Sequence, residues 1–83
     1  MKSNLNELYE LVLFSEDKNT NFREAMINLM HRLIIEPIQH GVYEHEEFDS
    51  SYFQTNNDII KGIDWLEEIG FDMNKDIEIK LNE

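Results

Sequence analysis

Residues 21–37, NFREAMINLMHRLIIEP, place apolar side chains along two sides of a helix. One line is formed by Phe22, Met26, Leu29 and Leu33, and a second by Ile27, Met30 and Ile34, about 100° further round the helix. A helix that is apolar on two sides packs between two other elements. We therefore expect residues 21–35 to form the central helix of a small helical domain, with Asn21 and Glu24 capping its start.

Pro37 should interrupt this helix, because it lacks a backbone N–H and disfavours helical geometry at the preceding residue, Glu36. We expect the helix to end or kink near Ile35. Residues 38–40 are compatible with one more turn, which Gly41 would close. The polar run of residues 15–20 predicts a short connection between the central helix and an antiparallel neighbour before it.

Two further helices are predicted, one before and one after the central helix. The first covers residues 4–14, where Asn4 and Glu7 form a capping pair. The last covers residues 57–69, with a cap among residues 55–57 and a Schellman ending at Gly70. Their inward faces are Leu5, Leu8, Tyr9 and Val12 in the first helix, and Ile59, Ile63 and Leu66 in the last.

The predicted fold class is all-α: one small domain, residues 1–83, of three to four short helices, with a possible short C-terminal extended or β segment. The predicted core is Leu5, Leu8, Val12, Phe22, Met26, Leu29, Leu33, Ile59, Ile63 and Leu66. Five apolar residues fall outside these lines: Leu11, Phe14, Ile27, Ile34 and Ile35. They indicate either a wide core-facing surface or the contact face of a two-fold dimer.

The C-terminal tail, residues 72–83, contains a run that alternates polar and apolar side chains from Asp76 to Leu81. Period-two alternation is typical of a half-buried strand. The partner for such a strand could be a segment near residues 42–46, a second copy of the chain or a bound protein. The alternative is a last helical turn that uses Ile77 and Leu81.

Negative charge is concentrated between Glu36 and Asp72. This stretch has ten acidic residues and one basic residue, Lys61, so it carries −9 of the net charge of −11. It also holds six of the nine aromatic residues. Such a surface repels nucleic acid and membranes and attracts a basic protein surface. We therefore expect a protein partner with a basic surface, no direct nucleic-acid binding and no membrane insertion.

Residues 42–55 show no helical or strand periodicity and are predicted to be an acidic aromatic loop. The candidate partner-binding residues, from this loop and the last helix, are Tyr43, Glu44, Glu46, Glu47, Phe48, Asp49, Tyr52, Asp58, Trp65 and Glu68. Trp65 points away from the inward face of its helix. It is therefore either an exposed anchor for the partner or a cover for the loop, and the acidic run is either an epitope or a solvated loop.

Catalytic and metal-binding signatures are missing from the sequence. There is no Gly-rich phosphate loop, no serine nucleophile elbow and no cysteine. His40, His45 and the nearby carboxylates match neither zinc nor EF-hand spacing. We expect no enzyme activity, no metal and no cofactor. The N-terminus lacks a secretory signal, and the longest apolar run, residues 11–14, is too short to span a membrane, so we expect a soluble cytoplasmic protein.

In length, acidity and helix order the chain resembles the small bacterial immunity proteins that neutralise colicin-type DNases. Residues 49–53 (DSSYF) and 59–65 (IIKGIDW) resemble the short aromatic third helix and the Trp-bearing last helix of that family. The family's Asp-Leu-Ile-Tyr-Tyr-Pro motif is absent and the tryptophan is displaced by one position, so the chain is not assigned to it. The composition also resembles that of small acidic phage-encoded proteins that disable or retune host factors.

These observations predict a non-enzymatic acidic regulator or inhibitor that binds a basic surface of a partner protein. One alternative is a nucleic-acid mimic, in which carboxylates replace phosphates and block a DNA- or RNA-binding protein. Another is a self-associating phage or bacterial accessory factor, such as a lysis or assembly regulator, which would bury its apolar excess in an oligomer such as a homodimer.

Overall fold

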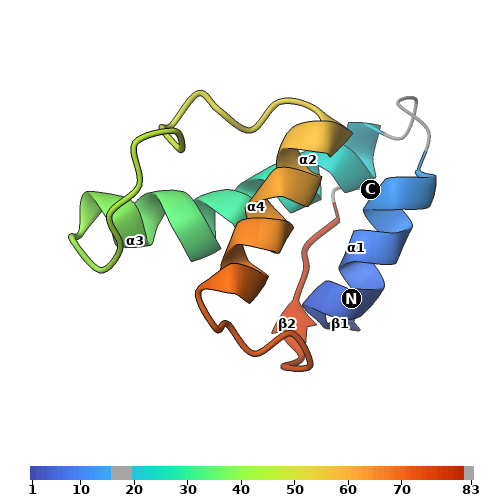
Figure 1. The fold of residues 1–83 in the computed structure, drawn as a ribbon. Helices are drawn as coiled ribbons and strands as arrows, with labels where there is room; N and C mark the ends of the chain where they lie inside the picture. The colour runs from blue at the N-terminus through green and yellow to red at the C-terminus, as the bar shows by residue number, and fades with distance from the viewer. Residues whose placement is uncertain (16–19, 82–83) are drawn as a thin grey trace.

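The computed structural model describes residues 1–15 and 20–81, which form a mostly helical domain with a short two-stranded sheet. Its elements are β1 (Lys2–Ser3), α1 (Leu5–Phe14), α2 (Thr20–Met30), the π-helical turn η1 (His31–Ile35), α3 (Glu36–Gln39), α4 (Asn56–Glu68) and β2 (Ile77–Glu78). The segments α2, η1 and α3 follow one another without a break, and α4 packs against both α1 and α2 (Figure 1). The predicted small helical domain is therefore confirmed in outline.

The starts of α1 and α4 are fixed by side-chain caps that the sequence predicts. The Asn4 side-chain oxygen accepts the Glu7 N–H at 2.9 Å, which confirms the cap of α1. At α4, Thr55 Oγ1 accepts the Asp58 N–H and the Asp58 carboxylate accepts the Thr55 N–H at 3.0 Å, a complete capping box. Both helices therefore begin where orphan backbone donors find acceptors.

The end of α4 is the predicted Schellman motif. Gly70 has a φ of +89°, a conformation that costs glycine little and other residues more. The Phe71 N–H donates to the Leu66 carbonyl at 3.0 Å and the Gly70 N–H donates to the Glu67 carbonyl at 3.1 Å. These two bonds satisfy carbonyls at the helix end and turn the chain back toward the sheet.

The start of α2 differs from the prediction. The helix already includes Thr20, so Asn21 lies inside it and is not the cap. The polar connection predicted over residues 15–20 falls mostly on residues 16–19, which lie outside the described part of the chain.

Of the two outcomes predicted near Ile35, an end or a kink, the end is wrong, because the helix continues and its geometry changes to a π turn over His31–Ile35. The Glu36 N–H donates to the His31 carbonyl, five residues earlier, and helical geometry continues through Pro37 to Gln39. A proline ring collides with the carbonyl four residues before it in a regular α-helix. Widening the preceding turn by one residue moves that carbonyl away. The further turn closed by Gly41, with a φ of +77°, is confirmed.

The π turn also changes which residues enter the core. In a wider turn each residue advances by a smaller angle, so Ile34 rotates onto the line that Leu33 would occupy in a regular helix. Ile34 and Ile35 are buried and Leu33 is only half-buried. This rotation places in the core two of the apolar residues that the sequence left for a wide surface or a dimer.

Most of the predicted core is confirmed. Eight of the ten predicted residues are buried, and Phe22 and Leu33 pack partly buried against them. The residues that complete the core are Ala25, Met30, Ile34, Ile35, Phe48, Phe53 and Ile79. The loop and the tail thus each contribute buried side chains to a core that the sequence assigned to helices alone.

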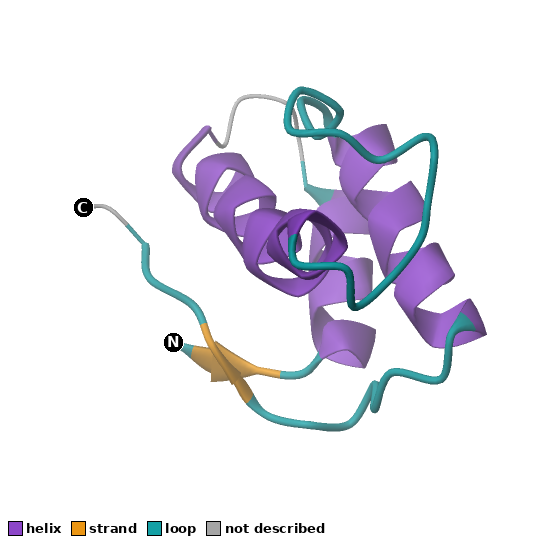
Figure 2. Ribbon diagram, turned by 90° about the vertical axis from the view of Figure 1, so that its left-hand side faces the viewer, coloured by secondary structure: helices purple, strands orange, loops and turns teal. Residues whose placement is uncertain are grey.

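The tail pairs with the N-terminal strand, which is not among the partners predicted from the sequence. β2 runs antiparallel to β1, with Lys2 opposite Glu78 and Ser3 opposite Ile77, and the two strands lie side by side at one end of the domain (Figure 2). The Arg32 side chain on η1 donates to the Glu78 carbonyl at 3.3 Å. These contacts seat Ile79, 1% exposed, against the helices.

We predict that Ile79→Ala destabilises the domain by about 2–5 kcal/mol, because it leaves a cavity in the core. Leu81→Ala is the matched control two residues along the same tail. Leu81 is 41% exposed, so its replacement should change stability by no more than about 0.5 kcal/mol. Urea denaturation of the two variants measures the difference, and equal midpoints would show that the tail is not part of the core.

Candidate functional site

The loop of residues 42–55 runs from the end of α3 back to the start of α4 and is held against α4 by aromatic side chains. It leaves α3 at Gly41 and enters α4 at Thr55 (Figure 1). Its aromatic cluster, as we define it, consists of Tyr43, His45, Phe48, Tyr52, Phe53 and Trp65. The structure therefore brings together the four aromatic residues that the sequence nominated: Tyr43, Phe48, Tyr52 and Trp65.

Phe48 is the centre of the aromatic cluster. It is 5% exposed, with its ring stacked on His45 at 4.2 Å and on Phe53 at 5.4 Å between ring centres. Tyr52 and Trp65 form edge-to-face pairs with it, at 4.9 and 5.4 Å between ring centres. Stacked and edge-to-face pairs at these distances add to the free energy gained by burial. Phe48 therefore faces the inside of the loop and anchors it to the domain.

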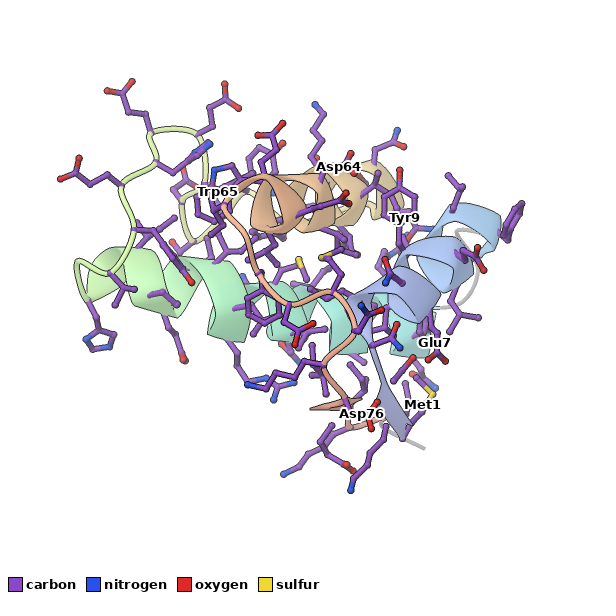
Figure 3. All side chains as sticks on the ribbon, turned by 60° about the horizontal axis from the view of Figure 1, so that its bottom comes forward. Met1, Glu7, Tyr9, Asp64, Trp65 and Asp76 are labelled. Atoms are coloured by element: carbon purple, nitrogen blue, oxygen red, sulfur yellow. The ribbon has the colours of Figure 1, made fainter. Side chains whose placement is uncertain are left out.

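Trp65 covers the loop, which is one of the two alternatives that the sequence left open. The ring is half-buried and makes edge contacts with Tyr43 at 5.4 Å and His45 at 5.1 Å. In Figure 3 it points from α4 toward the loop. Trp65 therefore helps to position the loop residues, and part of its ring stays exposed.

Gly62 lets the loop approach α4 closely. A Cβ atom at this position would lie 2.7 Å from Cε1 of Phe53 and 3.0 Å from the Met30 sulfur. Both distances are shorter than side chains tolerate without movement, so only glycine leaves room for the Phe53 ring. The sequence held a signal for this contact, since a glycine inside a helix costs stability unless packing requires it.

The carboxylates of Glu44, Glu46, Glu47 and Asp49 lie on the outer, exposed side of the same loop. Within residues 1–15 and 20–81, the one ion pair found joins the N-terminal amine to Glu78, far from the loop. The four negative charges of the loop therefore have no positive partner among the described residues. They form an exposed acidic surface above a buried aromatic base.

Asp49 is also held in place by hydrogen bonds. The Ser51 hydroxyl donates to the Asp49 carboxylate at 2.7 Å and the Ser51 N–H donates at 2.9 Å. These bonds, the hydroxyl first, lower the pKa of the Asp49 carboxyl below its ordinary value. A lowered pKa in the folded state stabilises the fold above the unfolded-state pKa, and this contribution is lost as the pH falls through the folded-state pKa.

Two other candidates have different settings. Asp58 belongs to the capping box of α4 and also accepts the Gln54 N–H at 3.2 Å, so its carboxylate fixes the end of the loop. Glu68 is exposed in the last turn of α4, beside Glu67. Glu68 thus adds to the acidic surface, whereas Asp58 acts in the local structure.

A shallow groove between α1 and α4 gathers residues that the sequence reading missed. It has a volume of about 500 Å³ and is lined by Asn6, Tyr9, Glu10, Asp64, Glu67 and Met73. Tyr9 and Asp64 lie close together in Figure 3. The sequence alone could not identify this groove, because its two walls come from segments that lie far apart in the sequence.

Other kinds of site receive no support from the described residues. Nowhere in residues 1–15 and 20–81 do three or more His, Asp or Glu side chains lie close enough together to hold a metal ion. None of the described helices has the length and apolar character that crossing a membrane requires. Comparison with protein-family models, curated proteins and solved structures finds no match to this chain.

We predict that Phe48→Ala destabilises the domain by about 3–5 kcal/mol, because the ring is enclosed by four others. Phe14→Ala makes the same change at a side chain that is 80% exposed and should cost no more than about 0.5 kcal/mol. Urea denaturation gives both values. If Phe48→Ala is as mild as Phe14→Ala, the loop does not pack on α4 as described.

We predict that Gly62→Ala lowers the melting temperature, although alanine favours helices. The expected gain in helix propensity is about 0.5–1 kcal/mol, and the collision with the Phe53 ring should cost about 1–3 kcal/mol. Asp64→Ala, at an exposed position of the same helix, supplies the propensity change without the collision. A Gly62→Ala variant that melts at or above the wild-type temperature would refute the close contact.

Proposed function

We propose that this protein is a non-enzymatic regulator or inhibitor that binds a basic surface of a partner protein. The binding surface is the outer side of loop 42–55 together with the C-terminal part of α4, which carries Trp65 and Glu68. The observation that carries the proposal is the unpaired acidic surface on a loop anchored by buried rings. Carboxylates displayed in this way attract a complementary basic surface and accelerate its approach.

Anchoring supports binding because it reduces the entropy lost on association. A mobile loop must be ordered when the partner arrives. A loop whose Phe48 and Phe53 side chains are already packed against α4 loses less conformational freedom on binding. The aromatic cluster also offers the exposed parts of Tyr43, Tyr52 and Trp65 beside the charges. Tyrosine and tryptophan are frequent among the residues that contribute most to protein–protein affinity.

The distribution of charge on α4 supports the same proposal. Glu67 and Glu68 lie in the last turn, where the helix dipole is negative, and that turn has no basic residue. Carboxylates at this end destabilise a helix slightly, and nearby carboxylates in the loop repel one another. Stability alone would not favour this arrangement, whereas binding to a basic partner would.

The test is removal of the loop charge without a change in side-chain shape. Replacing Glu44, Glu46 and Glu47 by Gln should slow association with the partner about tenfold or more at low salt. Melting temperature should be unchanged or slightly raised, because mutual repulsion is removed. The protein captured by the immobilised wild type from an extract of the source cells supplies the partner, and its association rate with each variant is then measured.

The matched control is Gln at Glu10, Glu24 and Glu36, three exposed glutamates outside the loop. Both variants have a net charge three units less negative, so they differ only in where the charge is lost. The loop variant alone should bind slowly, and added salt should narrow the difference. Equal rates for the two variants would contradict a loop site. Competition by double-stranded DNA or RNA for the same partner surface would favour nucleic-acid mimicry over other forms of inhibition.

A further inference from the structure

His45 lies between the acidic outside and the aromatic inside of the loop. Its half-buried ring is nearly parallel to Phe48, at 16° and 4.2 Å, and meets Trp65 edge-on at 80° and 5.1 Å. A change in its charge therefore acts at the point where the carboxylates join their anchor.

The hydrogen bond of His45 identifies the form of the ring in this structure. Its Nδ1 atom accepts the backbone N–H of Glu47 at 3.1 Å. An accepting imidazole nitrogen carries no proton, so the ring is neutral with its proton on Nε2. Protonation would convert Nδ1 into a donor facing another donor, and the Glu47 N–H would lose its acceptor. Histidine is the side chain that most readily changes charge between about pH 5 and 8.

The charged groups on the elements around the ring are mostly negative. In the loop they are Glu44, Glu46, Glu47 and Asp49, and in α4 they are Asp58, Lys61, Asp64, Glu67 and Glu68. Of these, Lys61 and Glu68 lie one turn on either side of Trp65. Tyr43 and Tyr52 are the other titratable side chains of the aromatic cluster. An imidazolium at this position therefore has carboxylates available as new partners once the Glu47 N–H is released.

We propose that His45 is a proton-controlled latch for the partner-binding loop. The neutral ring holds the turn of residues 45–47 against the aromatic cluster. The protonated ring releases the Glu47 N–H and cancels one negative charge of the acidic surface. This regulatory meaning rests on the proposed function, because the loop is the proposed binding site. It implies weaker binding to a basic partner at about pH 5.5 than at about pH 7.5.

The experiment follows the backbone amide of Glu47 by nuclear magnetic resonance between about pH 5 and 8 in the isolated protein. His45→Asn is the informative variant, because the asparagine oxygen can take the place of Nδ1 and cannot be protonated in this range. The Glu47 amide shift should titrate in the wild type and stay constant in His45→Asn. At about pH 5.5 the wild-type amide should exchange with water about threefold to tenfold faster than that of the variant.

His40→Asn is the matched control at an exposed histidine just before the loop, and it should keep the wild-type titration. A Glu47 signal that stays still while the His45 ring signals titrate overturns the latch. So does a titration that persists in His45→Asn. If that variant folds poorly, the wild type suffices, because the midpoints of the His45 ring and the Glu47 amide must coincide. This test uses no partner, so its failure leaves the proposed function standing. Failure of the charge-removal test would remove the regulatory meaning of the latch but not the coupling of the Glu47 amide to His45.

Discussion

The packing of Phe48 between His45, Phe53 and Trp65 is the contact on which the arrangement of this protein depends. Without this packing, the fourteen residues of loop 42–55, which have no regular secondary structure, could take many paths beside α4. The buried rings select one path, and Gly62 leaves the necessary space on the helix. The capping box at Thr55 and Asp58 then fixes the point at which the loop becomes a helix. These contacts therefore determine where the acidic side chains of the loop lie.

Charge and packing have opposite effects in this region. The carboxylates of the loop and of the last turn of α4 repel one another and receive no basic partner within residues 1–15 and 20–81. Burial of the aromatic rings offsets that repulsion. The proposed recognition of a basic surface relies on this cluster of like charges fixed by hydrophobic contacts, because a basic partner would supply the missing positive charge.

Local signals in the sequence predicted much of the helical fold. Asn4, Thr55 and Gly70 are caps whose effect depends on a few neighbouring residues, and each acts as expected. Hydrophobic spacing identified eight buried core residues correctly for the same reason. The π turn escaped prediction because a single extra residue before Pro37 does not alter the apolar pattern enough to be recognised.

Long-range contacts account for the other differences between the structure predicted from the sequence and the observed structure. The pairing of Lys2–Ser3 with Ile77–Glu78 joins the two ends of the chain. Alternation from Asp76 to Leu81 indicated the strand in the tail, but the two-residue strand at Lys2–Ser3 carries almost no periodic signal. The loop gathers the nominated Tyr43, Phe48, Tyr52 and Trp65, but periodicity could not tell which rings face inward. Composition located the candidate surface, and only the three-dimensional contacts separate its buried base from its exposed carboxylates.

The most direct test of this account is the backbone order parameter of each residue in the loop, obtained from ¹⁵N relaxation of the free protein. A loop anchored by Phe48 and Phe53 should be nearly as ordered as the helices, with values of about 0.8 or more for residues 43–53. Values below about 0.6 over these residues would mean that the loop moves freely. The acidic surface would then have no fixed geometry to offer a partner, and the central claim would be wrong.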